Sequence, residues 1–346
     1  MKLLIRATNW VGDAIMALPA LRAVRRRFSE AEIAILALPY VADVYRGQGI
    51  ADELIGYDRK GGHAGFRGRE RLIADLRSKK FSSALLLQNA FDAAWIAWRA
   101  GIPERIGYSR DARGLLLTKP ITVPRAGEIP AHEKFYYLEL VKRAGWIDAI
   151  PDVSEISLLV TEEQSRRAEE RLQSFGSQRG AARIAVGGGA AYGSAKCWPP
   201  ERFATAINQL LKARRAEVIL FGTTGEAAVS AAIQAGLDQA ALDLTGQTEI
   251  VELPALLSRC TAFLGNDSGA MHVAAAVGLP VVAVFGPTNP HGTAPVTPRC
   301  TIVQEQPYCS PCFLRRCPTD HRCMKAIAPE RVSAGVLHAL AEVAAG

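Results

Sequence analysis

The sequence lacks a hydrophobic run long enough to span a bilayer. Its longest apolar region, residues 273–285, is interrupted by Gly278 and Pro280, whereas a transmembrane helix needs about 20 apolar residues. Near the start, Arg6 and Asp13 interrupt the apolar stretch, so we recognise no export signal. We therefore expect a cytoplasmic protein whose seven cysteines are thiols or metal ligands rather than structural disulfides.

Two common nucleotide-binding motifs are also absent. The turn after the first apolar run contains only Gly12 where a dinucleotide fingerprint needs Gly-x-Gly-x-x-Gly, so a nicotinamide cofactor is not expected. A Walker-type phosphate loop is missing as well, which removes the support for ATP hydrolysis.

Positive charge is concentrated in one half of the chain. Residues 1–150 carry 24 Lys and Arg against 16 Asp and Glu, an excess of +8, whereas the remainder carries 17 against 18. Such an excess favours an anionic partner, namely a phosphorylated lipid, a membrane surface or a nucleic acid. The alternative is a basic face that only contacts solvent.

At 346 residues the chain is long enough for two domains. In the first half, short aliphatic runs alternate with amphipathic helical patterns, which is typical of βαβ units and a parallel sheet. After a break near Pro151, a capping box of Thr161 and Gln164 opens a charged helix, and the alternation resumes after a linker at residues 176–180. We therefore predict an α/β protein with two doubly wound, Rossmann-like domains. The expected strands cover residues 2–7, 32–38, 83–88, 183–186, 218–221, 262–265 and 281–285, and the expected helices cover residues 13–28, 69–79, 93–100, 132–144, 161–175 and 329–343.

The turn of residues 8–13 directly follows the first expected strand. In open parallel sheets, ligands bind beyond the carboxyl ends of the strands, where loops lead into helices. A carboxylate at this position, Asp13, can accept a proton from an attacking hydroxyl group as a general base. The alternative role for Asp13 is a helix N-cap that only satisfies backbone N–H groups.

The segment of residues 265–272, Gly-Asn-Asp-Ser-Gly-Ala-Met-His, lies between an apolar strand and a helical run. Ser268 can cap the helix, Gly269 permits close backbone approach, and the helix N–H groups favour a phosphate. His272, one turn further on, can donate another hydrogen bond. The pattern predicts a phosphate site, and the alternative is an unliganded helix cap with a core histidine.

Two further loops follow strands of the second half, and they converge on the same edge if its sheet is parallel. In residues 187–196, small side chains leave room for a ligand, and Lys196 offers a mobile positive charge to a leaving diphosphate unless it is an exposed loop lysine. In residues 221–226, Glu226 can accept hydrogen bonds from ribose hydroxyls, although the helix dipole alone also favours a first-turn glutamate. Trp198 with Pro199 indicates a packed helix entry.

Several motifs are spread over nearly the whole chain, namely Asn9-Trp10-Val11-Gly12-Asp13, Ala195-Lys196-Cys197-Trp198-Pro199, Phe221-Gly222, Asn266-Asp267-Ser268-Gly269 with Met271-His272, and Phe285-Gly286-Pro287-Thr288. As a set they resemble the ADP-heptose lipopolysaccharide heptosyltransferases, glycosyltransferase family 9, and within it the heptosyltransferase II group. The resemblance implies a GT-B fold, with two Rossmann-like domains facing each other across a cleft. It also implies an inverting transfer of L-glycero-D-manno-heptose from ADP-heptose to the inner-core heptose of a lipid A–Kdo precursor.

The resemblance assigns residues and segments to roles. The catalytic candidates are Asp13, as general base, and Lys196, which with His272 would hold the diphosphate. Residues 1–157 would bind the acceptor, residues 158–328 the ADP-sugar, and the final helix, residues 329–346, can pack back on the N-terminal domain. The donor-binding candidates are Ala190, Lys196, Thr223, Glu226, Asp267, Ser268, Gly269 and His272. The acceptor-binding candidates are Asn9, Trp10, Arg59, Lys60, Arg110 and Arg113.

The implied partners are ADP-heptose and an anionic lipid A-core acceptor, with peripheral contact at the inner face of the inner membrane and no nucleic acid. The basic N-terminal half then matches an anionic acceptor. Because the sequence has no Asp-x-Asp metal motif, we expect Lys196, His272 and helix N–H groups to neutralise the departing ADP, with no cofactor required for catalysis.

Four cysteines, Cys309, Cys312, Cys317 and Cys323, lie within residues 309–323 together with His321. The Cys-x2-Cys pair is a good half-site for structural zinc, but the spacing of the second pair is unlike that of common zinc folds. The sequence therefore leaves open a structural zinc site, a redox pair or free buried thiols.

Three other functions are compatible with these features. The first is heptosyltransferase I or another ADP-sugar transferase of the same family. The second is a sugar-nucleotide epimerase with the GT-B fold, which needs no lipid acceptor and does not explain the basic N-terminal half. The third is a non-catalytic nucleotide-sugar sensor, in which Asp13→Ala would leave the measured behaviour unchanged.

Overall fold

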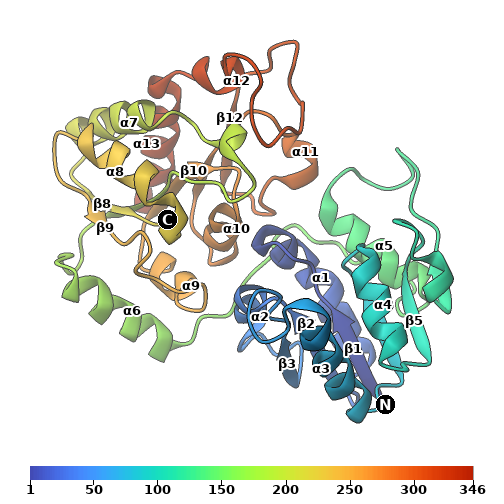
Figure 1. Cartoon of the computed structure of the whole chain (residues 1–346). Helices are drawn as coiled ribbons and strands as arrows, with labels where there is room; N and C mark the ends of the chain where they lie inside the picture. Colours follow the sequence, from blue (N-terminus) through green and yellow to red (C-terminus); the bar gives the residue numbers. More distant parts are fainter. Residues whose placement is uncertain (346) are drawn as a thin grey trace. The chain divides into compact units, whose positions relative to one another are not determined.

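A computed structural model describes residues 1–345 of the chain, which divide into two compact units (Figure 1). The N-terminal unit is Met1–Val153, and the C-terminal unit begins at Ser154. This division falls slightly before the boundary expected at residue 157. The reason is that the backbone N–H groups of Ile156 and Leu158 already donate to carbonyl groups of the C-terminal unit.

The N-terminal unit contains a parallel sheet of six strands in the order β3-β2-β1-β4-β5-β6. The order reverses direction between β1 and β4, as in a doubly wound Rossmann-like fold. Its strands are β1 (Lys2–Arg6), β2 (Glu32–Ala37), β3 (Glu53–Gly56), β4 (Ser83–Leu86), β5 (Glu104–Tyr108) and β6 (Lys119–Ile121). Its helices are α1 (Val11–Arg27), α2 (Pro39–Tyr45), α3 (Gly65–Ser78), α4 (Phe91–Arg99) and α5 (Glu133–Arg143).

The C-terminal unit repeats this arrangement. Its sheet order is β12-β11-β10-β7-β8-β9, again parallel, with the reversal between β7 and β10. Its strands are β7 (Arg183–Gly187), β8 (Glu217–Leu220), β9 (Leu242–Asp243), β10 (Ala262–Asn266), β11 (Val281–Phe285) and β12 (Cys300–Gln304). Its helices are α6 (Glu162–Ser174), α7 (Pro200–Ala213), α8 (Ala227–Ala235), α9 (Leu253–Leu257), α10 (Gly269–Ala276), α11 (Pro290–Thr293), α12 (Arg322–Lys325) and α13 (Pro329–Ala345). The predicted α/β class is confirmed.

The central strands are buried and mostly apolar because helices cover the sheets, and their few polar residues lie at the strand ends. Every residue of β10 and β11 is buried, and in β1 only Lys2 is partly exposed. The strands that the sequence analysis did not predict include the four at the sheet edges, β3, β6, β9 and β12. These strands are short or mix polar with apolar residues, so they carry little periodic signal.

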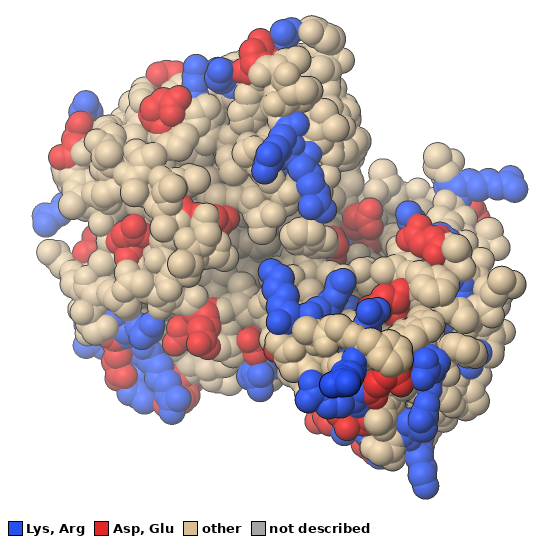
Figure 2. Space-filling view, viewed as in Figure 1, with Lys and Arg blue, Asp and Glu red and all other residues tan. Residues whose placement is uncertain are grey.

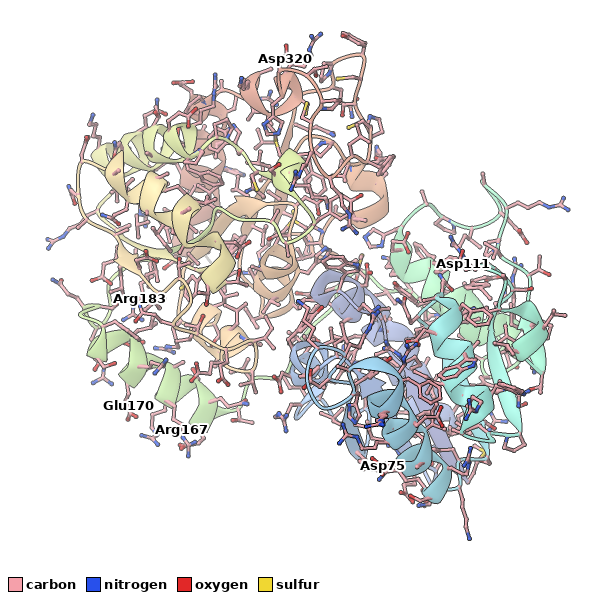
Figure 3. The ribbon with its side chains drawn as sticks, in the orientation of Figure 1. Asp75, Asp111, Arg167, Glu170, Arg183 and Asp320 are labelled. Atoms are coloured by element: carbon pink, nitrogen blue, oxygen red, sulfur yellow. The ribbon has the colours of Figure 1, made fainter. Side chains whose placement is uncertain are left out.

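Two helix starts bear on the predictions. Helix α6 begins with the expected capping box, in which Thr161 and Gln164 each accept a hydrogen bond from the other's backbone N–H group. Its outward-facing ion pairs include Arg167 with Glu163 (Figure 3). Helix α1 has Trp10 at its N-cap position, without a side-chain cap.

Among the described residues, no helix combines the length and the apolar character needed to cross a membrane.

The final helix, α13, packs within the C-terminal unit. Its buried side chains Val332, Val336 and Leu340 enter the same apolar cluster as Val282 of β11, and the helix lies against α7. The apolar face that we expected to return to the N-terminal domain is thus used for the core of its own unit.

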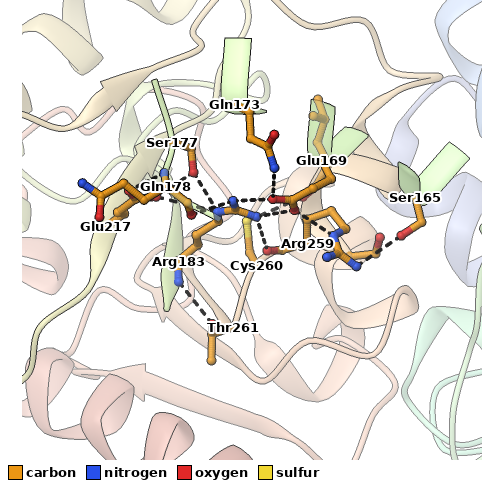
Figure 4. A network of polar contacts seen from close by, with 12 residues as sticks. Ser165, Glu169, Gln173, Ser177, Gln178, Arg183, Glu217, Arg259, Cys260 and Thr261 are labelled. Carbon is orange, nitrogen blue, oxygen red and sulfur yellow. Dashed lines mark hydrogen bonds and ion pairs between the residues drawn. The ribbon is translucent and has the colours of Figure 1, made fainter. Parts of the chain in front are cut away.

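A buried ionic network joins α6 to the amino-terminal end of β7 (Figure 4). The guanidinium of Arg183 donates to both carboxylate oxygens of Glu169, at 2.7 and 2.8 Å, and to the hydroxyl of Ser177 at 2.8 Å. Arg259 donates to the same carboxylate at 3.0 Å. These hydrogen bonds, that from Arg183 above all, hold the pKa of Glu169 well below its usual value.

We predict that Glu169→Gln destabilises the protein by about 3–5 kcal/mol at pH 7, because the buried Arg183 then keeps only the more distant carboxylate of Glu217, at 3.7 Å, as a counter-charge. A carboxylate with a lowered pKa stabilises the fold above its unfolded pKa of about 4.3 and loses this contribution as the pH falls further. The difference between wild type and variant in urea unfolding should therefore shrink below about pH 4.

The matched control is Glu170→Gln, the next residue on α6, whose exposed ion pair with Arg166 should contribute less than about 1 kcal/mol. Equal losses of unfolding free energy for the two variants, or a difference that does not change with pH, would contradict this role of Glu169.

Candidate functional site

The donor-binding candidates follow three neighbouring strands of the C-terminal sheet. Ala190 and Lys196 lie after β7, Thr223 and Glu226 after β8, and the remaining candidates after β10. Because these strands are parallel and adjacent, their loops meet at one edge of the sheet. This edge includes the reversal between β7 and β10, which is where open α/β sheets bind ligands.

A buried ion pair spans the reversal. The ammonium group of Lys196 lies 2.5 Å from the carboxylate of Asp267, and the hydroxyl of Thr288 donates to the same carboxylate oxygen at 2.6 Å. The Lys196 side chain is only 12% exposed, so the expectation of a mobile lysine is wrong. The pair instead fixes the loop after β7 to the start of α10, with a positive charge held in place.

Asn266, which the sequence analysis included in the phosphate-site segment without a role of its own, supports the same loop. It is fully buried at the end of β10. Its amide donates to the carbonyl of Gly188 at 2.7 Å, and its carbonyl accepts from the backbone of Trp198 at 2.9 Å. The sequence did contain a signal for this role, because Asn266 is a polar residue directly after an expected apolar strand. Trp198 is buried against Phe203, which confirms the packed helix entry predicted at this residue.

The start of α10 differs in one respect from expectation. Ser268 occupies the N-cap position, but its hydroxyl makes no capping hydrogen bond, so the predicted Ser268 cap is wrong. The first-turn N–H groups therefore have no side-chain cap, and such groups favour an anion. His272 lies one turn into the helix and is 4% exposed.

Glu226 joins the loop after β8 to the loop after β7. Its carboxylate accepts from the backbone N–H and the hydroxyl of Thr223, at 2.7 and 2.9 Å. A Cβ atom at Gly189 would lie 2.1 Å from the same carboxylate. A larger residue at Gly189 would therefore displace the Glu226 carboxylate, which explains part of the small-residue run that the sequence shows.

The cysteine-rich segment, residues 309–323, is attached to the loop after β7. The Tyr192 hydroxyl donates to the carbonyl of Phe313 at 2.7 Å, and the backbone N–H of Ala195 donates to Arg315 at 3.1 Å. The Tyr192 ring also contacts two cations, Lys196 at 4.8 Å and Arg315 at 5.2 Å from its centroid. Arg315 is thus a positive group near the candidate site that the sequence analysis missed.

The four thiols of this segment lie near one another. Burial raises the pKa of Cys323, and the neighbouring Cys309, Cys312 and Cys317 raise it further. Within residues 1–345, however, no group of three or more His, Cys, Asp or Glu side chains is arranged to hold a metal ion. The zinc site stays a prediction from sequence, without support from the side-chain arrangement.

In the N-terminal unit, the acceptor-binding candidates also share one edge. Asn9 and Trp10 follow β1, Arg59 and Lys60 follow β3, and Arg110 follows β5. All six strands are parallel, so these loops lie at the carboxyl edge of the sheet. Trp10 and the three cations are exposed there, and Arg110 pairs with Asp111 (Figure 3).

The assignment of Arg113 to acceptor contact is wrong, because its side chain is fully buried. Its guanidinium donates to the carbonyl of Tyr108 at 2.9 Å, to the carbonyl of Gln88, and to the side chain of Asn89 at 2.9 Å. Burial lowers its pKa to about 10. Arg113 therefore joins the loops after β4 and β5 and does not reach a ligand.

Arg6 has a similar role at the end of β1. It is buried, and it donates to the side chain of Asn9 at 2.9 Å and to the carbonyl of Ala7 at 2.6 Å. Burial lowers its pKa to about 10, so it remains protonated at neutral pH. Arg6 orients Asn9 in the loop that leads to Asp13.

Asp13 is half-buried in the first turn of α1. The helix begins at Val11 with Trp10 as N-cap, so the alternative in which Asp13 is the N-cap is wrong. The pKa of Tyr137 is raised, mainly because Tyr137 is buried and further because the negative charge of Asp13 lies nearby. A helix dipole favours a carboxylate in this position, and Asp13 lies at the carboxyl edge of the N-terminal sheet.

Two Rossmann-like units with the same strand order, together with the likeness to a solved heptosyltransferase, place the chain in the GT-B class of glycosyltransferases. The model of glycosyltransferase family 9 (heptosyltransferase) matches residues 69–322. The chain therefore belongs to glycosyltransferase family 9, as the motifs indicated. This membership favours a transferase over the epimerase and the sensor.

Characterised relatives resemble the chain over most of its length. Lipopolysaccharide heptosyltransferase 2 of Salmonella typhimurium is 29% identical over 88% of both chains. Lipooligosaccharide heptosyltransferase 2 of Haemophilus influenzae is 30% identical, also over 88% of both. The solved structure of Escherichia coli ADP-heptose lipopolysaccharide heptosyltransferase II is similar over 99% of both chains, with a TM-score of 0.82 and 26% identity.

Proposed function

We propose that this protein transfers L-glycero-D-manno-heptose from ADP-heptose to the inner-core heptose of a lipid A–Kdo precursor, with inversion at the anomeric carbon. The observation that carries the proposal is the Lys196–Asp267 pair beside the uncapped start of α10. A fixed ammonium group and helix N–H groups at a switch point suit a diphosphate. The similarity to heptosyltransferases 2 supports the sugar and the acceptor.

The donor would lie along the loops after β7, β8 and β10. The ammonium group of Lys196 has three N–H donors. One of them can point to Asp267, and the others remain for a phosphate oxygen. The α10 N–H groups and His272 would bind the remaining phosphate oxygens. Glu226 and Thr223 would contact the ribose hydroxyls.

Transfer requires one proton acceptor and one stabilised leaving group. Asp13 takes the proton of the acceptor hydroxyl as its oxygen forms a bond to the anomeric carbon. The bond from that carbon to the phosphate oxygen breaks on the opposite face, and its electron pair leaves with ADP. Lys196 and the α10 N–H groups stabilise the charge that develops on ADP.

The acceptor side is basic. Arg59, Lys60 and Arg110 are exposed at the carboxyl edge of the N-terminal sheet, and Figure 2 shows Lys and Arg side chains gathered over α2 and α3. This charge suits the phosphates and keto-acid carboxylates of a lipid A–Kdo acceptor. The enzyme would work in the cytoplasm, peripherally at the inner face of the inner membrane.

The first prediction concerns the acceptor. Incubation of the protein with ADP-heptose and core acceptors of defined structure should add one heptose to the acceptor that already carries one heptose. Mass spectrometry of the product measures this gain. Addition only to the heptose-free acceptor would instead assign heptosyltransferase I, and loss of donor without any acceptor would indicate an epimerase.

Asp13→Ala should lower turnover by about 10²-fold or more, because the acceptor hydroxyl loses its general base. ADP affinity, measured by calorimetry, should stay within about twofold of wild type, since the donor loops belong to the other unit. Asp75→Ala, an exposed carboxylate on α3 (Figure 3), is the control and should leave turnover unchanged. Unchanged turnover in Asp13→Ala would remove Asp13 from the mechanism.

We also propose transfer without a divalent ion, because Lys196 and helix N–H groups already supply positive charge at the leaving group. Enzyme treated with EDTA and then freed of it should keep the turnover of untreated enzyme. Activity that vanished with EDTA and returned only with Mg²⁺ or Mn²⁺ would contradict this proposal.

A further inference from the structure

Two cations share the ring of Tyr192, in the loop after β7. The ammonium nitrogen of Lys196 lies 4.8 Å from the ring centroid, and the guanidinium carbon of Arg315 lies 5.2 Å from it. Both distances lie within the range of a cation–π contact, which holds a charged side chain against an aromatic ring. The two charges can be no farther apart than these two distances together. Arg315 therefore belongs to the immediate surroundings of Lys196.

Only one of the two charges has a carboxylate partner. Lys196 pairs with Asp267 at 2.5 Å, whereas the guanidinium group of Arg315 makes no ion pair and donates no hydrogen bond within the described part of the chain. One positive charge at this loop is thus left without a counter-charge, and two like charges beside one ring repel each other. A bound anion would remove this repulsion, and it can reach Arg315 because that residue is exposed.

The backbone of Arg315 is held against the same loop. Its carbonyl group accepts a hydrogen bond from the backbone N–H of Ala195 at 3.1 Å. A Cβ atom at Gly193 would lie 2.2 Å from this carbonyl oxygen, so a larger residue there would push the two backbones apart. The Nε2 atom of His321 lies 2.8 Å from the carbonyl oxygen of Ala195, which ties the segment to the loop a second time. The fold itself therefore places Arg315.

A second loop supports both the ion pair and the segment that carries the unpaired guanidinium group. The backbone N–H of Phe313 donates to the carbonyl group of Pro287, in the loop after β11, at 2.8 Å. Thr288, the next residue of that loop, donates to the carboxylate of Asp267. The loops after β7 and β11 thus hold the two positive charges in a fixed arrangement before any ligand binds.

We propose that Arg315 binds a phosphate oxygen of the donor's diphosphate, beside Lys196. A guanidinium group carries five N–H donors in a planar fork, which can bind two oxygens of one phosphate group. An ammonium group is a point charge without this directionality. The two cations therefore have complementary tasks, one neutralising charge and the other orienting the diphosphate. The inference rests on the proposed function for the identity of the anion as part of ADP-heptose.

The experiment measures the binding of ADP and of inorganic pyrophosphate to the full chain by calorimetry, without acceptor. Arg315→Gln should weaken the binding of both ligands about tenfold, because hydrogen bonds to a charged group are lost. Arg315→Lys keeps the charge but loses the fork, so the loss should be only about threefold. The unfolding temperature without ligand should stay that of wild type in both variants, because the side chain is exposed.

Arg316→Gln is the matched control. Arg316 is the next residue and is also exposed, but among residues 1–345 its guanidinium group has no ring contact and no ion pair. The substitution removes the same charge from the same segment and should change either affinity by less than about twofold, because solvent screens the charge. Equal losses in Arg315→Gln and Arg316→Gln would mean that only net charge matters, and this result would overturn the proposal.

The binding and transfer assays can fail separately. ADP binding that Arg315→Gln leaves unchanged would remove this inference and keep heptose transfer intact. Binding of ADP and pyrophosphate that depends on Arg315, without transfer of heptose to any acceptor, would remove the proposed function and keep this inference. A wild-type protein that bound neither ligand would overturn both.

Discussion

Parallel pairing of every strand is the constraint on which the rest of this structure depends. In a parallel sheet all carboxyl ends lie at one edge, so loops that are far apart in the sequence are brought together there. In the C-terminal unit this places Lys196 beside Asp267, and in the N-terminal unit it places Arg59 and Arg110 at the same edge as Asp13. The same order repeats in both units, which therefore present equivalent edges with different chemistry.

The Lys196–Asp267 pair organises the edge of the C-terminal sheet at which we propose that the donor binds. A buried ion pair gives little net stability, because desolvation offsets much of its attraction. Its effect here is positional: Asp267 and Thr288 hold a positive charge at the start of an uncapped helix. The side chain of Asn266 fixes the same loop through hydrogen bonds to the backbone of Gly188 and Trp198. A leaving diphosphate would meet groups that need no rearrangement, which is how electrostatic catalysis is most effective.

The basic residues of the N-terminal unit are of two kinds, buried arginines that hold loops and exposed cations. Arg6 and Arg113 are buried, and their guanidinium groups hold loops through carbonyl and amide oxygens. Arg59, Lys60 and Arg67 are exposed beside Phe66 and remain available to an anionic partner. Composition counts both kinds alike, so net charge alone overstates the number of cations that a ligand or a bilayer can meet.

Periodicity in the sequence was sufficient for the central strands, the long helices and the two-domain α/β class. Strand β11 was predicted with the observed bounds, because a buried parallel strand is apolar throughout. The edge strands β3, β6, β9 and β12 were missed, since few apolar residues are needed where a strand has one neighbour. Motif spacing also located the loops that we propose to bind the donor, because their glycines and polar residues directly follow apolar strands.

Tertiary contacts decided what those residues do. Arg113 and Arg59 are both arginines in loops, yet only Arg113 is buried, because it is surrounded by carbonyl groups from the end of β5 and from the loop after β4. The partner of Lys196 lies 71 positions away at Asp267, and no local pattern encodes it. Local periodicity follows from backbone geometry within a few residues, whereas burial and pairing depend on which distant segments the folded sheet brings together.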